Sequence, residues 1–324
     1  MLRLSSEVEI KGEKTWVFHE LAGCTIVEDV ATLTDTCELL LPKKVNWQGS
    51  VDNKLPIKRG DKITVKLGYD DNLKTRFVGF IRTIDSKNPV KIVCEDGMFL
   101  LKTTATKKKG YKNTTLKQVI TDLLVGTGIQ IQLVDDDIEL RQYRILKDTV
   151  AEELNEMKST YGLRAYFRTI NDVSKLYVGL GYPFDNRRNE SFIYGKNLIS
   201  EDFVYRVSED VKIKVKAISI DSKNKRFELE VGDKDGEVYT VFHDNLTPDG
   251  LRLFAESELK RFKTTGFKGS LETFGEPFVS KCDITRVEAS DNNKGNFLNK
   301  KVETSSGMNG FRQKIEIGQP LKLD

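Results

Sequence analysis

The first hundred residues alternate apolar and polar side chains with a period of two, and this pattern constrains the fold more than any other feature. The alternation is clear at residues 8–10, 63–67 and 91–94, and turns rich in Gly, Asp and Asn separate the runs. A period of two places successive side chains on opposite faces of a strand. The pattern therefore predicts an antiparallel barrel or sandwich from the start of the chain to about Thr104.

The pattern then becomes helical. Apolar residues at helical spacing run from Leu116 to Leu124, with Thr115 as the expected N-cap and Gln118 in the capping-box position. Gly126 is placed to end this helix, because glycine readily adopts the conformation that follows a helix.

A second helix is expected from Thr149, where Glu152 completes a capping box, to Tyr161 and the stop at Gly162. Strand-like runs follow at residues 163–167 and 176–178. The middle third is therefore predicted to be a small α+β module.

The strand pattern returns after about Asp210. Runs at residues 211–220, 226–231 and 237–242 are followed by a helix that begins near Thr247, with Pro248 in its first turn, and then by four closing strands.

The predicted fold is mostly β with an α+β middle. We expect two β-barrel-like domains, over residues 1–104 and 210–324, to flank a small α+β module over residues 105–209. A chain of 324 residues exceeds the usual size of one hydrophobic core, which agrees with several domains.

Two stretches of the sequence resemble each other. Residues 59–65, followed by 77–81, echo residues 281–287, followed by 295–298. If the echo reflects a repeat, the first and last domains are related barrels, which bears on the symmetry of any assembly. A chance similarity between two β-hairpins is the alternative.

Composition argues against several classes of protein. The 52 basic residues nearly balance the 49 acidic ones, so the chain lacks the basic footprint of a dedicated nucleic-acid binder. No segment approaches the length of a membrane span, and the amino terminus has no apolar stretch of a signal peptide, so we expect synthesis and assembly in the cytoplasm. The cysteines show no paired spacing and are predicted to be buried or semi-buried thiols: Cys24, Cys37, Cys94 and Cys282.

The sequence offers little catalytic chemistry. The histidines, His19 and His243, are far apart, and each is expected inside a strand-like run. Residues 126–128 follow a helix rather than precede one, so they do not form a phosphate cradle. Residues 135–137, all Asp, are expected to form a solvated turn, and residues 107–109, all Lys, a solvated loop. No catalytic, cofactor-binding or metal-binding residue is predicted, and the partner-binding residues stay unknown.

The order of elements over nearly the whole chain is informative at residues 143–145, 149–167, 176–179, 267–272, 275–277 and 310–317, although the motifs there are loose. At these residues the chain resembles the late control protein D family. That family comprises the baseplate hub proteins of contractile phage tails and is related to the hub part of type VI secretion spike proteins. Where hub proteins commonly have Pro-Gly-Asp, this chain has Lys281-Cys282-Asp283 and keeps only the aspartate.

The resemblance implies a structural protein rather than an enzyme. It implies a homotrimeric ring in which two similar barrels per subunit alternate, so that the ring joins a sixfold tail tube to a threefold spike. The implied partners are a separate spike protein, expected because the chain stops at Asp324, together with tail tube and baseplate proteins. DNA or an effector would pass through the channel, and the subunit would end in a virion tail or an injection-system baseplate.

Two other functions stay open on the sequence alone. A cell-wall hydrolase carried in a tail would need a carboxylate pair in a cleft, and Asp and Glu are abundant enough to supply one. A nucleic-acid-binding module built on OB-like barrels would need a basic face lined by aromatic side chains.

Overall fold

The computed structural model describes residues 3–320, apart from 43–55, 86–88, 134–137, 139, 141, 162, 180–186, 222–224, 244–245 and 264–265. Strands dominate the described residues, which confirms the predicted mostly-β class. The strands from the two ends of the chain join into one large twisted sheet, and the strand order of this sheet does not close into a barrel among the described residues. The domain boundaries expected at residues 104 and 209 stay predictions.

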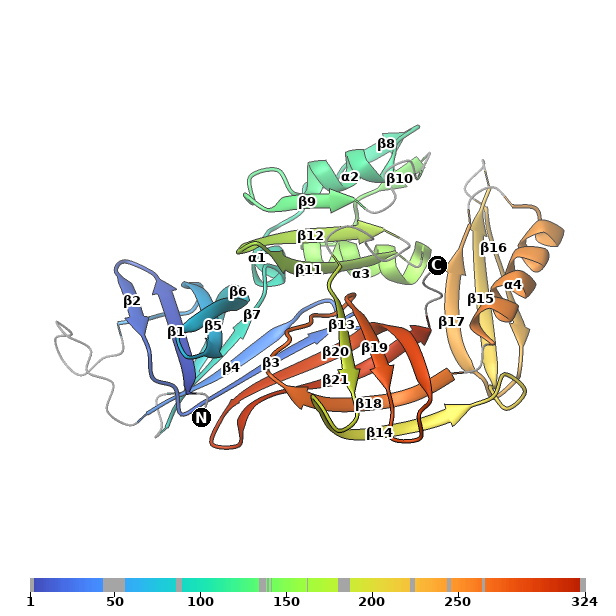
Figure 1. Ribbon diagram of the computed structural model, residues 1–324. Coiled ribbons are helices and arrows are strands. Elements are labelled where there is room, and N and C mark those ends of the chain that lie inside the picture. Colours follow the sequence, from blue (N-terminus) through green and yellow to red (C-terminus); the bar gives the residue numbers. More distant parts are fainter. Residues whose placement is uncertain are drawn as a thin grey trace.

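The large sheet has two halves, which lie side by side in the lower part of Figure 1. The amino-terminal half runs in the order β3-β4-β7-β6-β5-β1-β2, and the carboxy-terminal half in the order β14-β18-β21-β20, with β19 beside β20 and β13 beside β19. The strands of the amino-terminal half are β1 (Leu4–Lys11), β2 (Thr15–Phe18), β3 (Gly23–Asp29), β4 (Thr36–Leu41), β5 (Lys62–Tyr69), β6 (Asn72–Asp85) and β7 (Val90–Glu95). Those of the carboxy-terminal half are β13 (Asn189–Ile193), β14 (Leu198–Arg206), β18 (Gly266–Phe274), β19 (Ile284–Glu288), β20 (Lys294–Gly307) and β21 (Gly310–Pro320).

Inward-facing residues explain why these runs form strands. In β5, Ile63, Val65 and Leu67 are fully buried while the residues between them are more exposed, so the strand presents one apolar face. Each half buries such faces in its own hydrophobic core.

A small α+β module lies above the large sheet in Figure 1. Its sheet has the order β11-β12-β9, and its core gathers apolar side chains from helices and strands alike. Its elements are α1 (Met98–Thr103), β8 (Gly110–Lys112), α2 (Leu116–Leu123), β9 (Gln130–Leu133), β10 (Gln142–Arg144), α3 (Val150–Tyr161), β11 (Arg164–Ile170) and β12 (Val173–Gly179). The short α1 was not predicted from the sequence.

The predicted caps of α2 and α3 are present. The Thr115 hydroxyl accepts a hydrogen bond from the backbone N–H of Gln118. At α3 the bonds are reciprocal, because Glu152 N–H donates to the Thr149 hydroxyl and Thr149 N–H donates to the Glu152 carboxylate, at 3.3 and 3.1 Å. Two backbone donors that the first turn would leave unpaired are thus satisfied.

The capping box of α3 gives a first prediction. Thr149→Ala removes the hydroxyl acceptor, so we expect the free energy of unfolding to fall by about 1 kcal/mol, measured by urea denaturation. Thr160→Ala is the matched control at the other end of the helix, where the hydroxyl donates to the Glu156 carboxylate at 3.4 Å. Equal stability of the two variants would contradict the cap as a source of stability.

A further layer lies at the right of Figure 1, where α4 covers one face of a three-stranded sheet. Its elements are β15 (Ile213–Ile220), β16 (Arg226–Gly232), β17 (Glu237–Phe242) and α4 (Pro248–Phe262). Thr247 caps α4 by accepting a hydrogen bond from Gly250 N–H, and Pro248 occupies its first turn, as predicted. The apolar face of α4 lies against the sheet, with Leu251 and Ala255 fully buried.

The prediction that the cysteines are buried thiols is confirmed. All are free and buried: Cys24, Cys37, Cys94 and Cys282. Burial raises the pKa of the Cys94 thiol far above its ordinary value, so this thiol is neutral and unreactive at physiological pH.

Candidate assembly site

Two turns, one in each half of the large sheet, are built in the same way. In the first, the Asp61 carboxylate accepts from Lys58 N–H at 2.8 Å, and Asp61 N–H donates to the Lys58 carbonyl at 3.2 Å. In the second, Asp283 makes the same two bonds with Ser280, at 2.8 and 3.2 Å. Both aspartates are buried, so each closes its turn from within the protein.

The third residue of each turn has a positive φ. Gly60 has φ +91° and Cys282 has φ +68°. Glycine adopts this region without steric cost, whereas cysteine does not, so the second turn carries some backbone strain that its hydrogen bonds must hold. The second turn thus has the hydrogen-bond pattern of the first, although Cys282 stands where the first turn has Gly60.

The strands that follow the turns also match. Gly60 N–H donates to the Ile81 carbonyl, and Ile81 N–H donates to the Asp61 carbonyl, while Cys282, Asn299 and Asp283 make the corresponding bonds in the other half. Ile81 therefore corresponds to Asn299.

A bulge follows at the same point in each half. The pairing of β6 with β7 shifts between Ile81 and Thr83, and that of β20 with β21 shifts between Asn299 and Lys301. Bulges are specific backbone features, so their recurrence at corresponding positions, after matching turns, confirms the internal repeat that the sequence echo predicts.

The two halves are joined by strand pairing. Strand β20 pairs with β21 on one side and with β3 on the other, and the register with β3 runs from Lys301 opposite Asp29 to Gly307 opposite Gly23. The backbone bonds of one continuous sheet thus fix the two halves to each other.

A buried ion pair reinforces this joint. Lys281, with no exposed surface, lies in the second turn, and its ammonium group contacts the Asp35 carboxylate at 2.6 Å. The ammonium also lies 5.1 Å from the ring centre of Tyr166 in β11. Burial alone lowers the pKa of Lys281, but the nearby carboxylates of Asp35 and Asp96 raise it above its ordinary value, so the residue stays charged. Lys281 therefore connects both halves and the α+β module.

A second buried pair lies beside the first. Arg168 of β11 donates to the Asp283 carboxylate at 2.9 Å, and Arg188 N–H donates to the same oxygen at 3.1 Å. Asp283 thus closes its turn and holds the α+β module at the same time.

Two acidic groups in this cluster have pKa values near neutrality. Burial, with the charge of Asp35 adding to it, raises the pKa of Glu28 to about 8 and that of Asp96 to about 7. Glu28 is only half-buried as a residue, but its Oε2 atom is enclosed and has no hydrogen-bond partner among the described residues. Both groups therefore titrate near physiological pH.

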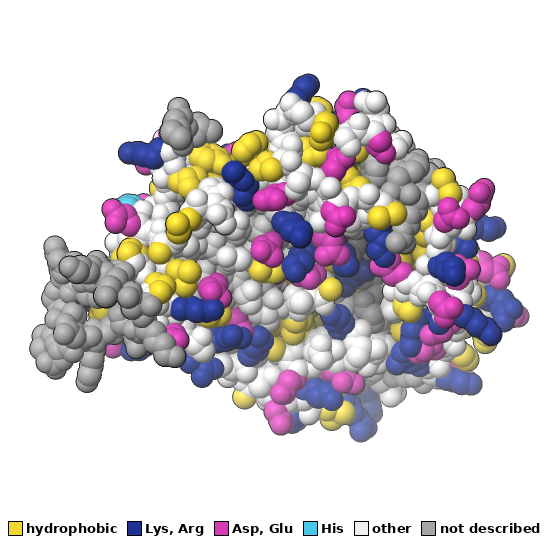
Figure 2. Space-filling view, turned by 90° about the horizontal axis from the view of Figure 1, so that it is seen from below, with side chains coloured by type: hydrophobic (Ala, Val, Ile, Leu, Met, Phe, Trp, Pro, Cys, Tyr) yellow, Lys and Arg dark blue, Asp and Glu magenta, His cyan; other side chains and the backbone are white. Residues whose placement is uncertain are grey.

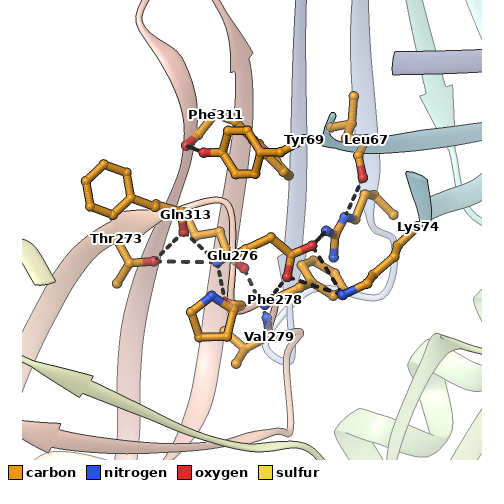
Figure 3. Close-up of polar contacts among 12 residues, drawn as sticks. Leu67, Tyr69, Lys74, Thr273, Glu276, Phe278, Val279, Phe311 and Gln313 are labelled. Atoms are coloured by element: carbon orange, nitrogen blue, oxygen red, sulfur yellow. Dashed lines mark hydrogen bonds and ion pairs between the residues drawn. The ribbon is translucent and has the colours of Figure 1, made fainter. Parts of the chain in front are cut away.

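A third contact between the halves is drawn in Figure 3. Arg76 of β6, whose side chain has no exposed surface, forms an ion pair with Glu276, which lies between β18 and β19. Its guanidinium group stacks 3.7 Å from the ring centre of Phe278, and burial lowers its pKa to about 10. Close by, the Tyr69 hydroxyl donates to the Phe311 carbonyl at 3.2 Å. The angle between the halves is thus fixed at several separate points.

The residues considered for catalysis are scattered. His19 and His243 are both exposed, and each lies directly after a strand rather than within one, so that detail of the prediction was wrong. Residues 135–137 lie outside the described residues. Within the described parts of the chain, no group of three His, Cys, Asp or Glu side chains could hold a metal ion.

The lysine run and the glycine pair also have structural roles. Lys108 donates to the carbonyls of Leu146 and Lys147 and pairs with Asp148, while Lys109 pairs with Asp122. Gly126 and Gly128, both with positive φ, follow the end of α2.

Basic and acidic side chains are interspersed over the face drawn in Figure 2.

Nothing in the sequence indicated a functional role for the buried charged residues that hold the two halves and the α+β module together. These residues are Glu28, Asp35, Arg76, Asp96, Arg168, Glu276 and Lys281. The only signal was the aspartate that the two echoed stretches share, Asp61 and Asp283, since it marks where the two turns lie.

No protein-family model and no curated protein matches the sequence of the chain. In the parts of the chain that the structure describes, no helix is long and apolar enough to cross a membrane.

Comparison of structures does find proteins with a similar fold. A prophage MuSo2 43 kDa tail protein from Shewanella oneidensis is 16% identical, with a TM-score of 0.63 and 97% and 98% of the two chains covered. A tail protein from Neisseria meningitidis is 13% identical, with a TM-score of 0.66 and coverage of 97% and 96%. An Escherichia coli component of the type VI secretion system, described as similar to the T4 phage tail proteins gp27 and gp5, is 12% identical, with a TM-score of 0.59 and coverage of 97% and 77%. Over nearly its whole length, the chain has the fold of these phage tail and type VI secretion proteins.

Proposed function

We propose that the chain is a structural hub subunit in the baseplate of a contractile phage tail or a related injection system. The observation that carries this proposal is the internal repeat, in which two halves with matching turns and bulges form one continuous sheet. A subunit that contains the same unit twice can form a trimer with six similar units around its axis. Such a ring matches a sixfold tube on one side and a threefold spike on the other.

The similar structures support the same role. They are tail proteins and a secretion-system component, and their likeness extends over nearly all of this chain. The proposed partners are two further copies of the chain, a spike protein, and tail tube and baseplate proteins, with DNA or an effector passing through the ring. The subunit would assemble in the cytoplasm and end in a virion tail or an injection-system baseplate.

The role needs no chemical step. The buried ionic groups described above lie between the halves and the α+β module, where they hold these parts at fixed angles. The function of the protein is then to set the diameter and symmetry of the ring through its interfaces.

The mass in solution tests the proposal. We expect light scattering on a sizing column to give a mass near three subunits, either for the chain alone at high concentration or after addition of its spike protein. A monomer under both conditions would refute the hub.

A further inference from the structure

Three of the free thiols lie together on the inner face of the large sheet. Cys24 is in β3, Cys37 in β4 and Cys94 in β7, and these strands are neighbours in the sheet (Figure 1). Cys37 lies directly opposite Cys94 on one side, and on the other side opposite Ile26, two residues along the same face from Cys24. All of these side chains belong to the core of the amino-terminal half. Thiols that meet in this way have a redox chemistry that the proposed hub does not use.

Two of these thiols are in direct contact. The sulfur atoms of Cys24 and Cys37 are 4.0 Å apart, although the residues are 13 positions apart in the chain. A disulfide bond is about 2.0 Å long, so the sulfurs have to approach each other by about 2 Å. Rotation of each side chain about its Cα–Cβ bond supplies part of this approach without a shift of the backbone.

Cys24 is the thiol of this pair that a dissolved oxidant reaches first. The pairing of β3 with β4 and with β20 ends at Gly23, so Cys24 lies one residue from the end of the strand on both sides. The residue before Gly23, Ala22, is exposed. Strand ends open locally at a small free-energy cost. Cys37 is fully buried, and burial raises the pKa of its thiol well above the ordinary value, so it does not start the reaction.

We propose that Cys24 and Cys37 form an intramolecular disulfide when the protein meets a small disulfide such as oxidised glutathione. The Cys24 thiolate attacks one sulfur of the small disulfide, forms a mixed disulfide and releases one thiolate. The Cys37 thiolate then attacks the Cys24 sulfur and releases the second thiolate. Each cysteine loses a proton, and the two electrons reduce the small disulfide to two thiols. This goes beyond the proposed function, because the reaction does not depend on the ring.

The new bond would restrain the strand that carries the joint between the halves. In β3, Cys24 lies opposite Ser306 of β20 on one side and opposite Leu39 of β4 on the other. A bond from β3 to β4 closes a loop of the chain and so stabilises the folded state against unfolding. The cytoplasm keeps thiols reduced, whereas the surroundings outside a cell are oxidising. In the proposed role, the bond would therefore form only after the particle leaves the cell.

Peptide mapping tests which thiols react. Trypsin cleaves after Lys and Arg, so it leaves Cys24 and Cys37 together in the peptide 15–43 and Cys94 in the peptide 92–102. The full-length protein is incubated with oxidised glutathione, unfolded, treated with iodoacetamide to block free thiols, and digested. A Cys24–Cys37 bond leaves the peptide 15–43 unblocked and about 2 Da lighter than its reduced form, because two hydrogens are lost. A bond to Cys94 would instead join the two peptides.

We expect most of the peptide 15–43 to carry the internal bond after oxidation, and all of its thiols to be blocked in the untreated protein. Three other results would overturn the proposal. Glutathione that stays on Cys24 would show that Cys37 does not reach it. Joined peptides would assign the bond to Cys94, and a fully blocked peptide after oxidation would show that the pair does not react.

Two variants check the assignment. Cys24→Ala should abolish the internal bond, because Cys37 then has no partner in contact with it. Cys94→Ala is the matched control, since Cys94 is also buried on this face and lies opposite Cys37. This control should form the bond to the same extent as the unmodified protein. Equal loss of the bond in both variants would contradict the pairing of Cys24 with Cys37.

Stability gives a second readout. We expect oxidation to raise the midpoint of urea denaturation by about 1 M in the unmodified protein, and dithiothreitol to reverse the rise. The midpoint of Cys24→Ala should not change on oxidation. The solution mass that tests the hub is measured on the reduced protein, so the two proposals fail separately. A trimer without the bond leaves the hub standing, whereas a monomer with the bond refutes only the hub.

Discussion

Lys281→Met is expected to lower the free energy of unfolding by about 3–5 kcal/mol. The substitution leaves the Asp35 carboxylate, 5% exposed, without the ammonium group that contacts it at 2.6 Å. Removing one partner of a buried ion pair destabilises a protein by far more than the intact pair stabilises it. The reason is that the desolvation cost of the remaining charge is no longer offset. Urea denaturation of the two proteins at pH 7 measures the difference.

Two further variants separate this effect from a general loss of a lysine. Lys300→Met removes an ammonium group from an exposed pair with Glu316, where both side chains are 41% exposed, so a loss of at most about 1 kcal/mol is expected. The double variant Lys281→Met/Asp35→Asn removes both charges of the buried pair and should lose less than the sum of the single variants. Additive losses would mean that the two residues do not stabilise each other.

Local pattern was enough to predict most strands and helices. In β5 the alternation reflects burial of Ile63, Val65 and Leu67, so the period of two in the sequence is the period of the strand itself. The caps at Thr115, Thr149 and Thr247 were equally predictable, because each hydroxyl satisfies a donor within the next three residues.

Pairing between distant strands could not be predicted. The joint of β20 with β3 connects residues more than 270 positions apart. The alternating pattern of each strand would be the same if the two strands lay in separate barrels. The sequence therefore indicated two barrel-like domains, whereas the structure shows their strands as two halves of one sheet. Alternation sets which face of a strand is buried, but it does not name the neighbouring strand.

The buried charges of the joint were hidden for a related reason. Lys281 and Asp35 are ordinary surface residue types, and only the fold brings them together across 246 positions. Asp283 was the one partial exception, because the sequence echo aligned it with Asp61, although nothing in the sequence showed that it also binds Arg168.

Glu28→Gln is expected to stabilise the protein at pH 8 while leaving it nearly unchanged at pH 4.5. Burial raises the pKa of Glu28 from its ordinary 4.5 to about 8 in the folded protein, with Asp35 adding to the effect and Lys281 opposing it. The folded state thus binds a proton more tightly than the unfolded state. Its contribution to stability is complete below about pH 4.5 and is lost as the pH rises toward 8.

Glutamine resembles the protonated acid, so the variant avoids that loss. The other charged groups that act on Glu28 are Asp283 and Arg188, and both stay in place in the variant. Urea denaturation of both proteins from pH 4.5 to 9 should therefore give curves that diverge with rising pH, by on the order of 2–4 kcal/mol at the upper end. Parallel curves would mean that Glu28 is already ionised in the folded joint. Divergence would show that ionisation of Glu28, which lies opposite Val302 at the joint between the two halves, destabilises the folded protein as the pH rises through neutrality.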